Sequence, residues 1–315
     1  MASHTNNKRK ITPDLIEQFY DLFSPCRLCP RECRVERKKG ELGNCRAGQK
    51  LKVASYHQHF GEEPPLVGKF GSGTIFFSHC NLHCVFCQNY EISQLGQGRT
   101  ISTEELAQYM LNLQTLGCHN INLVTPTPWI PQIVEALSIA QTQGLHIPIV
   151  YNCGGYESVS TLKLLEGIID IYMPDIKYSD DRNAEKYSKV QNYWSVVKSA
   201  LKEMYRQVGN LKCRHGIAES GLLIRHLVLP NSLAGTRDCF KFIAEELSKD
   251  TVVNVMAQYY PTFNAYKYPE INRRIKLQEY REALNILKEF GLDSGFQQTI
   301  DTIYRKIIPE WGEWS

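Results

Sequence analysis

The stretch TIFFSHCNLHCVFCQNY, residues 74–90, joins a short apolar run to a loop that carries three cysteines. Its first four residues, 74–77, are β-branched or aromatic and predict a buried strand. The cysteines follow in the spacing C-x3-C-x2-C, at Cys80, Cys84 and Cys87. Three thiolates this close together can hold three irons of a cubane cluster and leave the fourth iron without a protein ligand. Most iron–sulfur sites and structural zinc sites close the fourth position, so the alternative is a Cys3His zinc site completed by His79 or His83.

Strand-like runs alternate with helical periodicity after this loop. The expected strands are 74–77, 121–124, 147–151, 168–172, 223–229 and 252–258. Amphipathic helices fill the gaps between them, and the clearest begins at a capping box of Ser102 and Glu105 and ends at Gly117. This alternation predicts an α/β fold with a parallel sheet and right-handed crossovers. Six units are fewer than the eight of a closed barrel, so we expect an incomplete (β/α)6 TIM-like barrel rather than a doubly wound sheet.

The expected organisation is a cysteine-rich N-terminal extension over residues 1–70, a barrel over 71–300 and a C-terminal tail over 301–315. Turn formers are dense in the extension, as in the Pro64-Pro65 pair, so we expect mostly loops there. A short helical pattern near Leu15 and Phe19 is the exception.

Composition indicates an ordinary soluble protein, because 43% of the 315 residues are apolar and 22% are charged. A formal charge of +3 identifies no partner. The basic cluster at 8–10 is followed by polar residues rather than by the core of a signal peptide, and no apolar run is long enough to cross a membrane. We therefore expect a cytoplasmic protein with no membrane partner. In a reducing compartment, two clusters among eleven cysteines indicate two metal sites.

The three-cysteine loop, with Phe86 before its last cysteine and a strand before its first, resembles the cluster-binding loop of the radical S-adenosylmethionine (SAM) superfamily. The resemblance implies a [4Fe-4S] cluster on Cys80, Cys84 and Cys87, whose open iron is chelated by the amino and carboxylate groups of SAM. One electron, from a donor such as flavodoxin or ferredoxin, then cleaves SAM to methionine and a 5′-deoxyadenosyl radical, which abstracts hydrogen from a substrate. It also implies that Phe86 packs at the adenine.

Within that superfamily the chain is similar to the glycyl-radical activating enzymes, especially the pyruvate formate-lyase activating enzyme-like branch. Four further segments carry this similarity, which runs from about residue 22 to residue 300: CQNY at 87–90, YNCGGY at 151–156, MPDIK at 173–177 and RHLVLP at 225–230. The similarity implies an oxidoreductase whose substrate is a protein glycine.

Other classes of function stay open at this point. One is radical modification of RNA or of a small molecule, and others are a one-electron carrier and a non-catalytic zinc or iron–sulfur binding protein. Neither of the last two needs six strand ends that converge on a ligand cavity. Small basic runs, at Arg34, Arg37, Lys38, Lys39, Arg273 and Arg274, indicate solvated faces. Because no aromatic stripe is interleaved with them, we do not expect a nucleic-acid partner.

The similarity also suggests which residues bind the cofactor. Those that fall where activating enzymes hold a monovalent cation beside the SAM carboxylate are Asn152, Cys153, Met173 and Asp175. Asp175 is the expected ligand, because hard cations prefer oxygen, whereas Cys153 also suits plain packing. Arg225 matches an arginine that reaches the cofactor, with a structural ion pair as the alternative. Lys177 and His226 are further candidates.

One segment departs from the branch, which commonly has Gly-Gly-Glu after the second strand to receive the SAM amine. This chain has Val-Thr-Pro-Thr-Pro at 124–128. The hydroxyls of Thr125 and Thr127, with nearby carbonyls, can accept those hydrogen bonds instead.

A second group of cysteines precedes the barrel in the spacing C-x2-C-x3-C-x11-C, at Cys26, Cys29, Cys33 and Cys45. Four thiolates in a loop-rich segment suit tetrahedral zinc or a fully ligated iron–sulfur cluster, and free redox-active thiols are a third interpretation. The resemblance does not choose between the metals. We assign no role to four polar residues that follow, His57, His59, Glu62 and Glu63.

Overall fold

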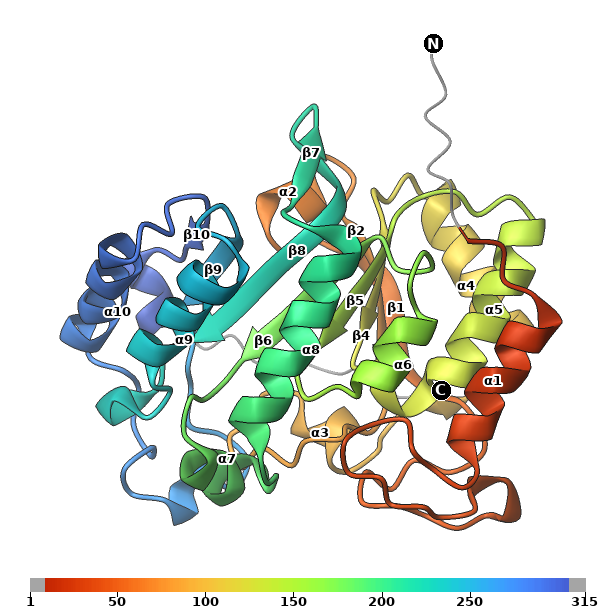
Figure 1. Cartoon of the computed structure of the whole chain (residues 1–315), viewed down its shortest axis with the longest axis horizontal. Coiled ribbons are helices and arrows are strands. Elements are labelled where there is room, and N and C mark those ends of the chain that lie inside the picture. Colours follow the sequence, from red (N-terminus) through yellow and green to blue (C-terminus); the bar gives the residue numbers. More distant parts are fainter. Residues whose placement is uncertain (1–8, 306–315) are drawn as a thin grey trace.

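The computed structural model describes residues 9–305, and its centre is one sheet with the strand order β10-β9-β8-β6-β5-β4-β2-β1-β3, in which β7 also pairs with β8 (Figure 1). The strands are β1 (Lys52–His59), β2 (Ser72–Phe77), β3 (Arg99–Thr100), β4 (Ile121–Val124), β5 (Ile149–Cys153), β6 (Ile171–Ile176), β7 (Lys212–Arg214), β8 (Ile217–Leu227), β9 (Val252–Met256) and β10 (Phe296–Gln297). All six predicted strands are present, as β2, β4, β5, β6, β8 and β9, and successive members of this series pair in parallel. The predicted α/β fold is confirmed.

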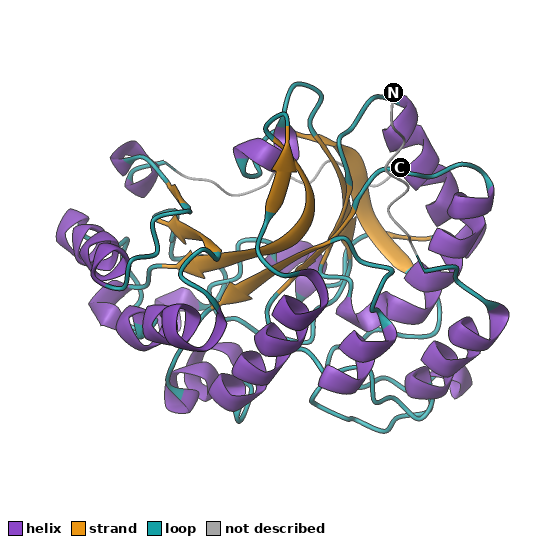
Figure 2. Cartoon of the chain, turned by 45° about the horizontal axis from the view of Figure 1, so that its top comes forward, coloured by secondary structure: helices purple, strands orange, loops and turns teal. Residues whose placement is uncertain are grey.

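The helices are α1 (Pro13–Phe23), α2 (Pro64–Val67), α3 (Tyr90–Ser93), α4 (Thr103–Thr115), α5 (Ile130–Thr142), α6 (Val159–Leu164), α7 (Asp181–Ser188), α8 (Tyr193–Val208), α9 (Thr236–Phe242) and α10 (Leu277–Glu289). Most of the longer ones lie along one side of the curved sheet, as Figure 2 shows. The short helix α2 packs on the other face, where Leu66 meets the cluster of Met173 and Leu223. Shorter turns of helix are η1 (Arg37–Lys39), η2 (Thr127–Trp129), η3 (Pro230–Ser232), η4 (Ile243–Leu247), η5 (Ala265–Lys267) and η6 (Ile300–Ile303). The sheet does not close on itself, since β3 and β10 are its two unpaired edges. The fold is therefore a partial barrel. No helix within residues 9–305 combines the length and the apolar character that a membrane span requires.

Helix starts follow their sequence signals in part. The Thr12 hydroxyl accepts a hydrogen bond from the Leu15 N–H at 3.3 Å and caps α1. The Ser102 hydroxyl accepts from the Glu105 N–H at 3.2 Å, so α4 begins as expected. The other half of that capping box is wrong, because the Glu105 carboxylate binds Arg99 instead.

The expectation of loops over residues 1–70 is wrong for β1, which pairs antiparallel with β2 and places His57 opposite Thr74. Only part of β1 is buried, and its sequence alternates poorly, so the periodicity that marks a strand is weak there. β1 belongs to the same sheet as the barrel strands, although it precedes the expected boundary at residue 70. The expected tail, 301–315, is described only as far as Arg305.

The segment between α1 and β1 also contradicts one expectation, because Arg37 is not part of a solvated face. Its side chain is buried, and its guanidinium lies 4.0 Å from the ring centre of Phe23. This segment, the red loop of Figure 1, lies at the same end of the sheet as α3.

Candidate cluster and cofactor site

A cavity of about 800 Å³ lies against the inner face of the partial barrel. Alternate residues of several strands line it, as β-strand geometry requires of one face. The lining from strands and their carboxyl ends is Ser55, His57, His59, Phe76, Val124, Thr125, Asn152, Cys153, Asp175, Lys177, Arg225, Leu227, Asn254 and Met256. The cavity therefore collects the positions where a parallel barrel is expected to hold its reactive groups.

All three cysteines of the loop after β2 line this cavity, at Cys80, Cys84 and Cys87. Burial raises the pKa of each thiol, and the neighbouring Cys84 raises those of Cys80 and Cys87 further, that of Cys87 to about 11. Buried thiols that repel one another's negative charge are suited to a metal centre, because a metal ion displaces their protons and compensates the thiolate charge. Backbone bonds from the His83 N–H to the Ser188 carbonyl (3.0 Å) and from the Val85 N–H to the Tyr187 carbonyl (2.8 Å) fix the loop.

Each of the three sulfurs also has a polar neighbour. Ser188 Oγ lies 3.0 Å from Cys84 Sγ, and Ser93 Oγ lies 3.1 Å from Cys87 Sγ. The Leu82 N–H donates to Cys80 Sγ at 3.4 Å. Hydrogen bonds to sulfur are a common feature of iron–sulfur sites, so the residues present fit a cluster bound by these three thiolates.

The geometry disfavours the Cys3His alternative. His83 Nδ1 lies 2.8 Å from Gln94 Oε1, and His83 Nε2 lies 2.6 Å from Asn44 Oδ1, so both ring nitrogens are engaged. His79 packs near Trp129 and is not part of the cavity lining. Across residues 9–305, no three His, Cys, Asp or Glu side chains are gathered so as to hold a single metal ion. A cubane makes a different demand, since each cysteine binds its own iron.

Asp175 and Lys177 form an ion pair at the end of β6, with 2.5 Å between Lys177 Nζ and Asp175 Oδ2. Burial disfavours the ammonium of Lys177, but the Asp175 carboxylate outweighs it, so the pKa of Lys177 is raised. The carboxylate expected to bind a monovalent cation thus already has a fixed cation beside it. Both side chains line the cavity, and the cation itself stays a prediction.

The two threonines of the 124–128 segment have different surroundings. Thr125 lines the cavity, and its N–H donates to the Asn152 carbonyl at 2.8 Å. Its φ of +59° is unusual for a β-branched residue, and such strained positions often occur at functional sites. Thr127 is buried outside the cavity lining, where its hydroxyl donates to Glu157 Oε1 at 2.8 Å. Of the two, Thr125 alone is placed to meet a ligand.

Arg225 also lines the cavity, next to Asp175 on the neighbouring strand, and is bound to two glutamates to which the sequence assigned no role. Its Nε donates to Glu63 Oε1 at 2.7 Å, and its Nη2 also pairs with Glu62. Asn254 adds a bond from Nδ2 to Glu63 Oε1 at 2.6 Å. Arg225 therefore forms a structural ion pair, which was the alternative to cofactor binding. Its side chain also lines the cavity.

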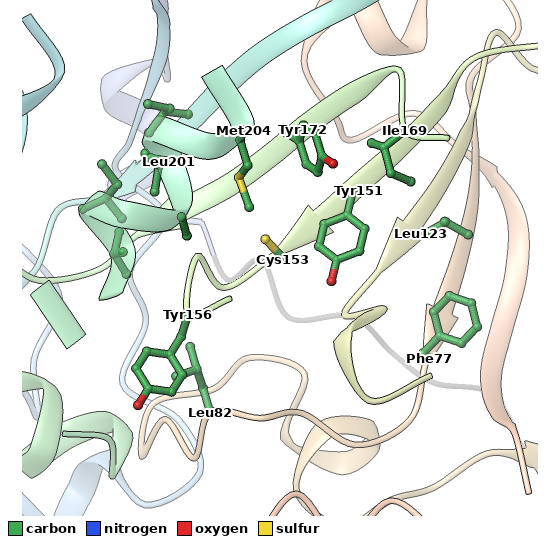
Figure 3. Close-up of a cluster of buried hydrophobic side chains, with 14 of the residues drawn as sticks. Phe77, Leu82, Leu123, Tyr151, Cys153, Tyr156, Ile169, Tyr172, Leu201 and Met204 are labelled. Carbon is green, nitrogen blue, oxygen red and sulfur yellow. The ribbon is translucent and has the colours of Figure 1, made fainter. Parts of the chain in front are cut away.

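Several other predicted positions lie in the core. Phe86 is buried at the cavity edge, with its ring centre 5.5 Å from that of Tyr259. Cys153 lies in the buried cluster with Tyr151 and Tyr172, as Figure 3 shows, although it also lines the cavity. Met173 is fully buried away from the cavity. His226 lies between the Ile176 carbonyl and the Thr236 hydroxyl, at 3.0 Å from each, and has no contact with the cavity.

The four N-terminal cysteines form a second group. Burial raises the pKa of Cys29 and of Cys45, and electrostatic interactions connect Cys45 to both Cys26 and Cys33. This group lies close to the three-cysteine loop, because Arg31 Nε donates to the Asn81 carbonyl at 2.6 Å. Nothing in the chain's local pattern signals that contact, which spans fifty positions.

Comparison with known proteins indicates the family to which this chain is related. Residues 74–217 match the family model described as "Radical SAM superfamily". An uncharacterised protein of Methanocaldococcus jannaschii is 34% identical over 302 residues, which cover 91% of this chain and 82% of the relative. Pyruvate formate-lyase-activating enzyme of Clostridium pasteurianum is 23% identical over 236 residues, which cover 72% of this chain and 90% of that enzyme.

Among solved structures, SuiB of Streptococcus suis bound to S-adenosylmethionine matches with a TM-score of 0.52 at 14% identity. The match covers 71% of this chain and 49% of SuiB, so the chain spans about half the length of that protein. The likeness shows a shared fold. Because the family model begins at β2, the strand that leads into the three-cysteine loop, and the fold agrees with it, this chain belongs to the radical SAM superfamily.

Proposed function

We propose that this chain is an enzyme that binds a [4Fe-4S] cluster on Cys80, Cys84 and Cys87, cleaves SAM reductively and abstracts hydrogen from a substrate. Superfamily membership implies the cluster and SAM. The observation that carries the proposal is that the three thiols face the same cavity as Asp175 and Lys177. When bound, the cluster and SAM supply one-electron cleavage of a sulfonium and a radical that abstracts hydrogen.

The chain's own residues would bind and orient the cofactor. The Lys177 ammonium, held by Asp175, is the cation in the lining best placed to attract a carboxylate. Thr125 and Asn152 offer a hydroxyl and an amide to the amine side of the amino-acid group. In this proposal, Asp175 positions Lys177 and supplies oxygen to a monovalent cation.

Phe86 is proposed to pack against the adenine. Its ring is held from behind by Tyr259, so its position is fixed before any ligand binds. Arg225, the neighbour of Asp175 on the adjacent strand, is proposed to reach a hydroxyl or carboxylate of the cofactor. Glu62 and Glu63 hold the guanidinium there.

For the substrate, we propose a glycine of a protein chain. Similarity to enzymes that activate pyruvate formate-lyase supports this class, as does a sheet with two free edges, since an unclosed barrel leaves room for a protein loop to enter. The electron donor is proposed to be a flavodoxin or ferredoxin. Radical modification of RNA or of a small molecule would use the same cavity, and the experiment below separates these outcomes.

The test is an anaerobic reconstitution with iron and sulfide, followed by incubation with SAM and a one-electron reductant. We expect a cubane EPR signal that changes when SAM is added, and formation of 5′-deoxyadenosine. Candidate substrates labelled with deuterium, including glycine-containing proteins, RNA and small molecules, then show which one transfers deuterium to 5′-deoxyadenosine. Cys118→Ala changes a buried cysteine outside the cavity, so this variant should behave as the wild-type chain does in the same assay. A colourless protein that leaves SAM intact would refute the proposal.

A further inference from the structure

We infer that Cys26, Cys29, Cys33 and Cys45 hold a second, anionic iron–sulfur cluster and that Arg37 is its buried counter-cation. The inference does not depend on the proposed function, because a tetrathiolate site is closed and needs no SAM. Two independent observations carry it: the charge balance around Arg37, and the surroundings of the four cysteines.

Arg37 is a charged residue that is only 1% exposed. Its guanidinium donates to the Gly48 carbonyl at 2.8 Å and to the Pro128 carbonyl at 2.7 Å, and it lies over the rings of Phe23 and Trp129. The carbonyls accept hydrogen bonds from the guanidinium, and the rings pack against it. Neither carries a net negative charge, so the positive charge of Arg37 is not neutralised. No carboxylate forms a salt bridge with Arg37 anywhere in residues 9–305. A guanidinium stays protonated in proteins, and a buried charge without a counter-charge is strongly unfavourable.

The groups that face this charge are the cysteines. Cys26 is a hydrogen-bond partner of the Arg37 guanidinium, and Cys29 and Cys45 also interact with its charge. Neutral thiols would leave the charge uncompensated. A single metal ion such as Zn²⁺ does not fit, because no three such ligands gather around one point in residues 9–305. A [4Fe-4S]²⁺ cluster, in which each thiolate binds its own iron, has a net charge of −2 on four thiolates. It supplies the anion that Arg37 lacks.

The fourth cysteine has the surroundings of a ligand as well. The Asn44 N–H donates to Cys33 Sγ at 3.3 Å. Gly43 lies so close that an added Cβ would be 3.2 Å from the same sulfur, and the absence of a side chain there lets the backbone approach it. Amide hydrogen bonds to sulfur and a close backbone are typical of thiolate ligands.

The proposed centre also stabilises the loop that carries Cys80, Cys84 and Cys87. Asn44, next to Cys45, meets His83 at 2.6 Å, and Arg31, between Cys29 and Cys33, donates to the Asn81 carbonyl at 2.6 Å. A metal that orders the segment thus orders two contacts to the loop that carries Cys80 to Cys87. Few apolar side chains of the segment are buried besides Leu28 and Ala47, so part of the binding energy of the metal becomes folding energy.

The experiment is metal and sulfide analysis of the full chain, purified without oxygen. Wild type is expected to hold two centres, and Cys29→Ser is expected to lose about four irons per chain, whereas loss of about one zinc instead would overturn the cluster. Cys213→Ser, at an exposed cysteine on β7, is the control and should match wild type. Cys84→Ala should keep the second centre while it loses the first. If Cys29→Ser has the metal content of wild type, the inference is overturned.

Arg37 is tested by the rate at which a chelator removes the metal. Arg37→Met should release the second centre at least about tenfold faster than wild type, and Arg37→Lys should lie between them, because lysine restores charge but not the planar fork. Release at the wild-type rate from Arg37→Met would overturn the role of Arg37. If a variant is too unstable to purify, the wild-type chain is treated with chelator and then with protease. Cleavage before residue 50 only after metal removal supports the centre, and equal protection before and after removal counts against it.

The two proposals fail separately. Loss of SAM cleavage with both centres present would refute the proposed function alone. A single centre, held by Cys80, Cys84 and Cys87 with full SAM cleavage, would refute the second centre alone.

Discussion

Gly155 and Asp175 meet so closely that a Cβ on Gly155 would lie 2.4 Å from the backbone oxygen of Asp175. Gly155 also has a φ of +77°, which glycine adopts without strain. The contact joins the ends of two neighbouring strands, β5 and β6, at the cavity. The position of the Asp175 side chain therefore depends on the absence of a side chain one strand away.

Gly155→Ala should reduce the free energy of unfolding by about 2–4 kcal/mol, since it adds a clash with backbone to the cost of a positive φ. Urea denaturation of the metal-free chain measures the change. Gly144→Ala is the matched control, because Gly144 has a φ of +97° and open space around its Cβ position. That control should lose only about 1 kcal/mol, from the backbone conformation alone. Equal losses in the two variants would mean that the contact with Asp175 is unimportant.

Asp175→Asn should weaken SAM binding by about tenfold, equivalent to about 1.4 kcal/mol, while iron content stays at the wild-type value. Asparagine keeps the shape but cannot hold the Lys177 ammonium by charge or neutralise a monovalent cation. Equilibrium dialysis with SAM, alongside iron analysis, separates the two effects. Asp250→Asn, at an exposed acid, serves as the control. Loss of iron in step with SAM binding would instead mark Asp175 as structural.

Ser93→Ala should lower the reduction potential of the first cluster by about 40 mV, which corresponds to about 1 kcal/mol for one electron. The Ser93 hydroxyl lies 3.1 Å from Cys87 Sγ, and a donor at the sulfur stabilises the more negative, reduced cluster. An anaerobic redox titration followed by EPR gives the potential. Ser199→Ala, on the exposed side of α8, should leave it unchanged. An unchanged potential in Ser93→Ala would show that this hydroxyl does not donate to the cluster.

Glu157 should make the stability of the protein depend on pH. Burial raises its pKa from 4.5 to about 7, although hydrogen bonds from Thr127 and Tyr151 favour the ionised form. Between those values the folded chain binds a proton that the unfolded chain has released, so the free energy of unfolding falls as pH rises from about 5 to about 8. Glu157→Gln removes this dependence, and its stability relative to wild type should rise by on the order of 2 kcal/mol between pH 5.5 and pH 8.

Urea denaturation at the two pH values checks this prediction. The same measurement on Glu245→Gln, an exposed glutamate, should show no such change. If Glu157→Gln keeps the pH dependence of wild type, another group is responsible for it.

Features that depend on neighbours in the sequence were predictable. The strand before Cys80 and the spacing of the cysteines are local patterns, and each of the six barrel strands is marked by a short run of its own. The polar groups that surround the ligand sites were harder. Arg225 meets Glu62 and Glu63 across more than 160 positions, and Arg37 meets the Pro128 carbonyl across 91. Their roles are set by the folded chain, so a run of basic residues gave no sign that one of them would be buried.

The contacts that anchor the N-terminal segment have a consequence for how the protein is made. The Leu28 carbonyl accepts a hydrogen bond from the Thr161 hydroxyl, 133 positions later in the chain, and Arg37 reaches Pro128. Translation delivers Cys26 to Cys45 first, whereas Pro128 and Thr161 follow Cys45 by 83 and 116 positions. Contacts of such long sequence separation form late in folding, so the four thiols stay accessible to oxidants and metals on the nascent chain until those partners have been made.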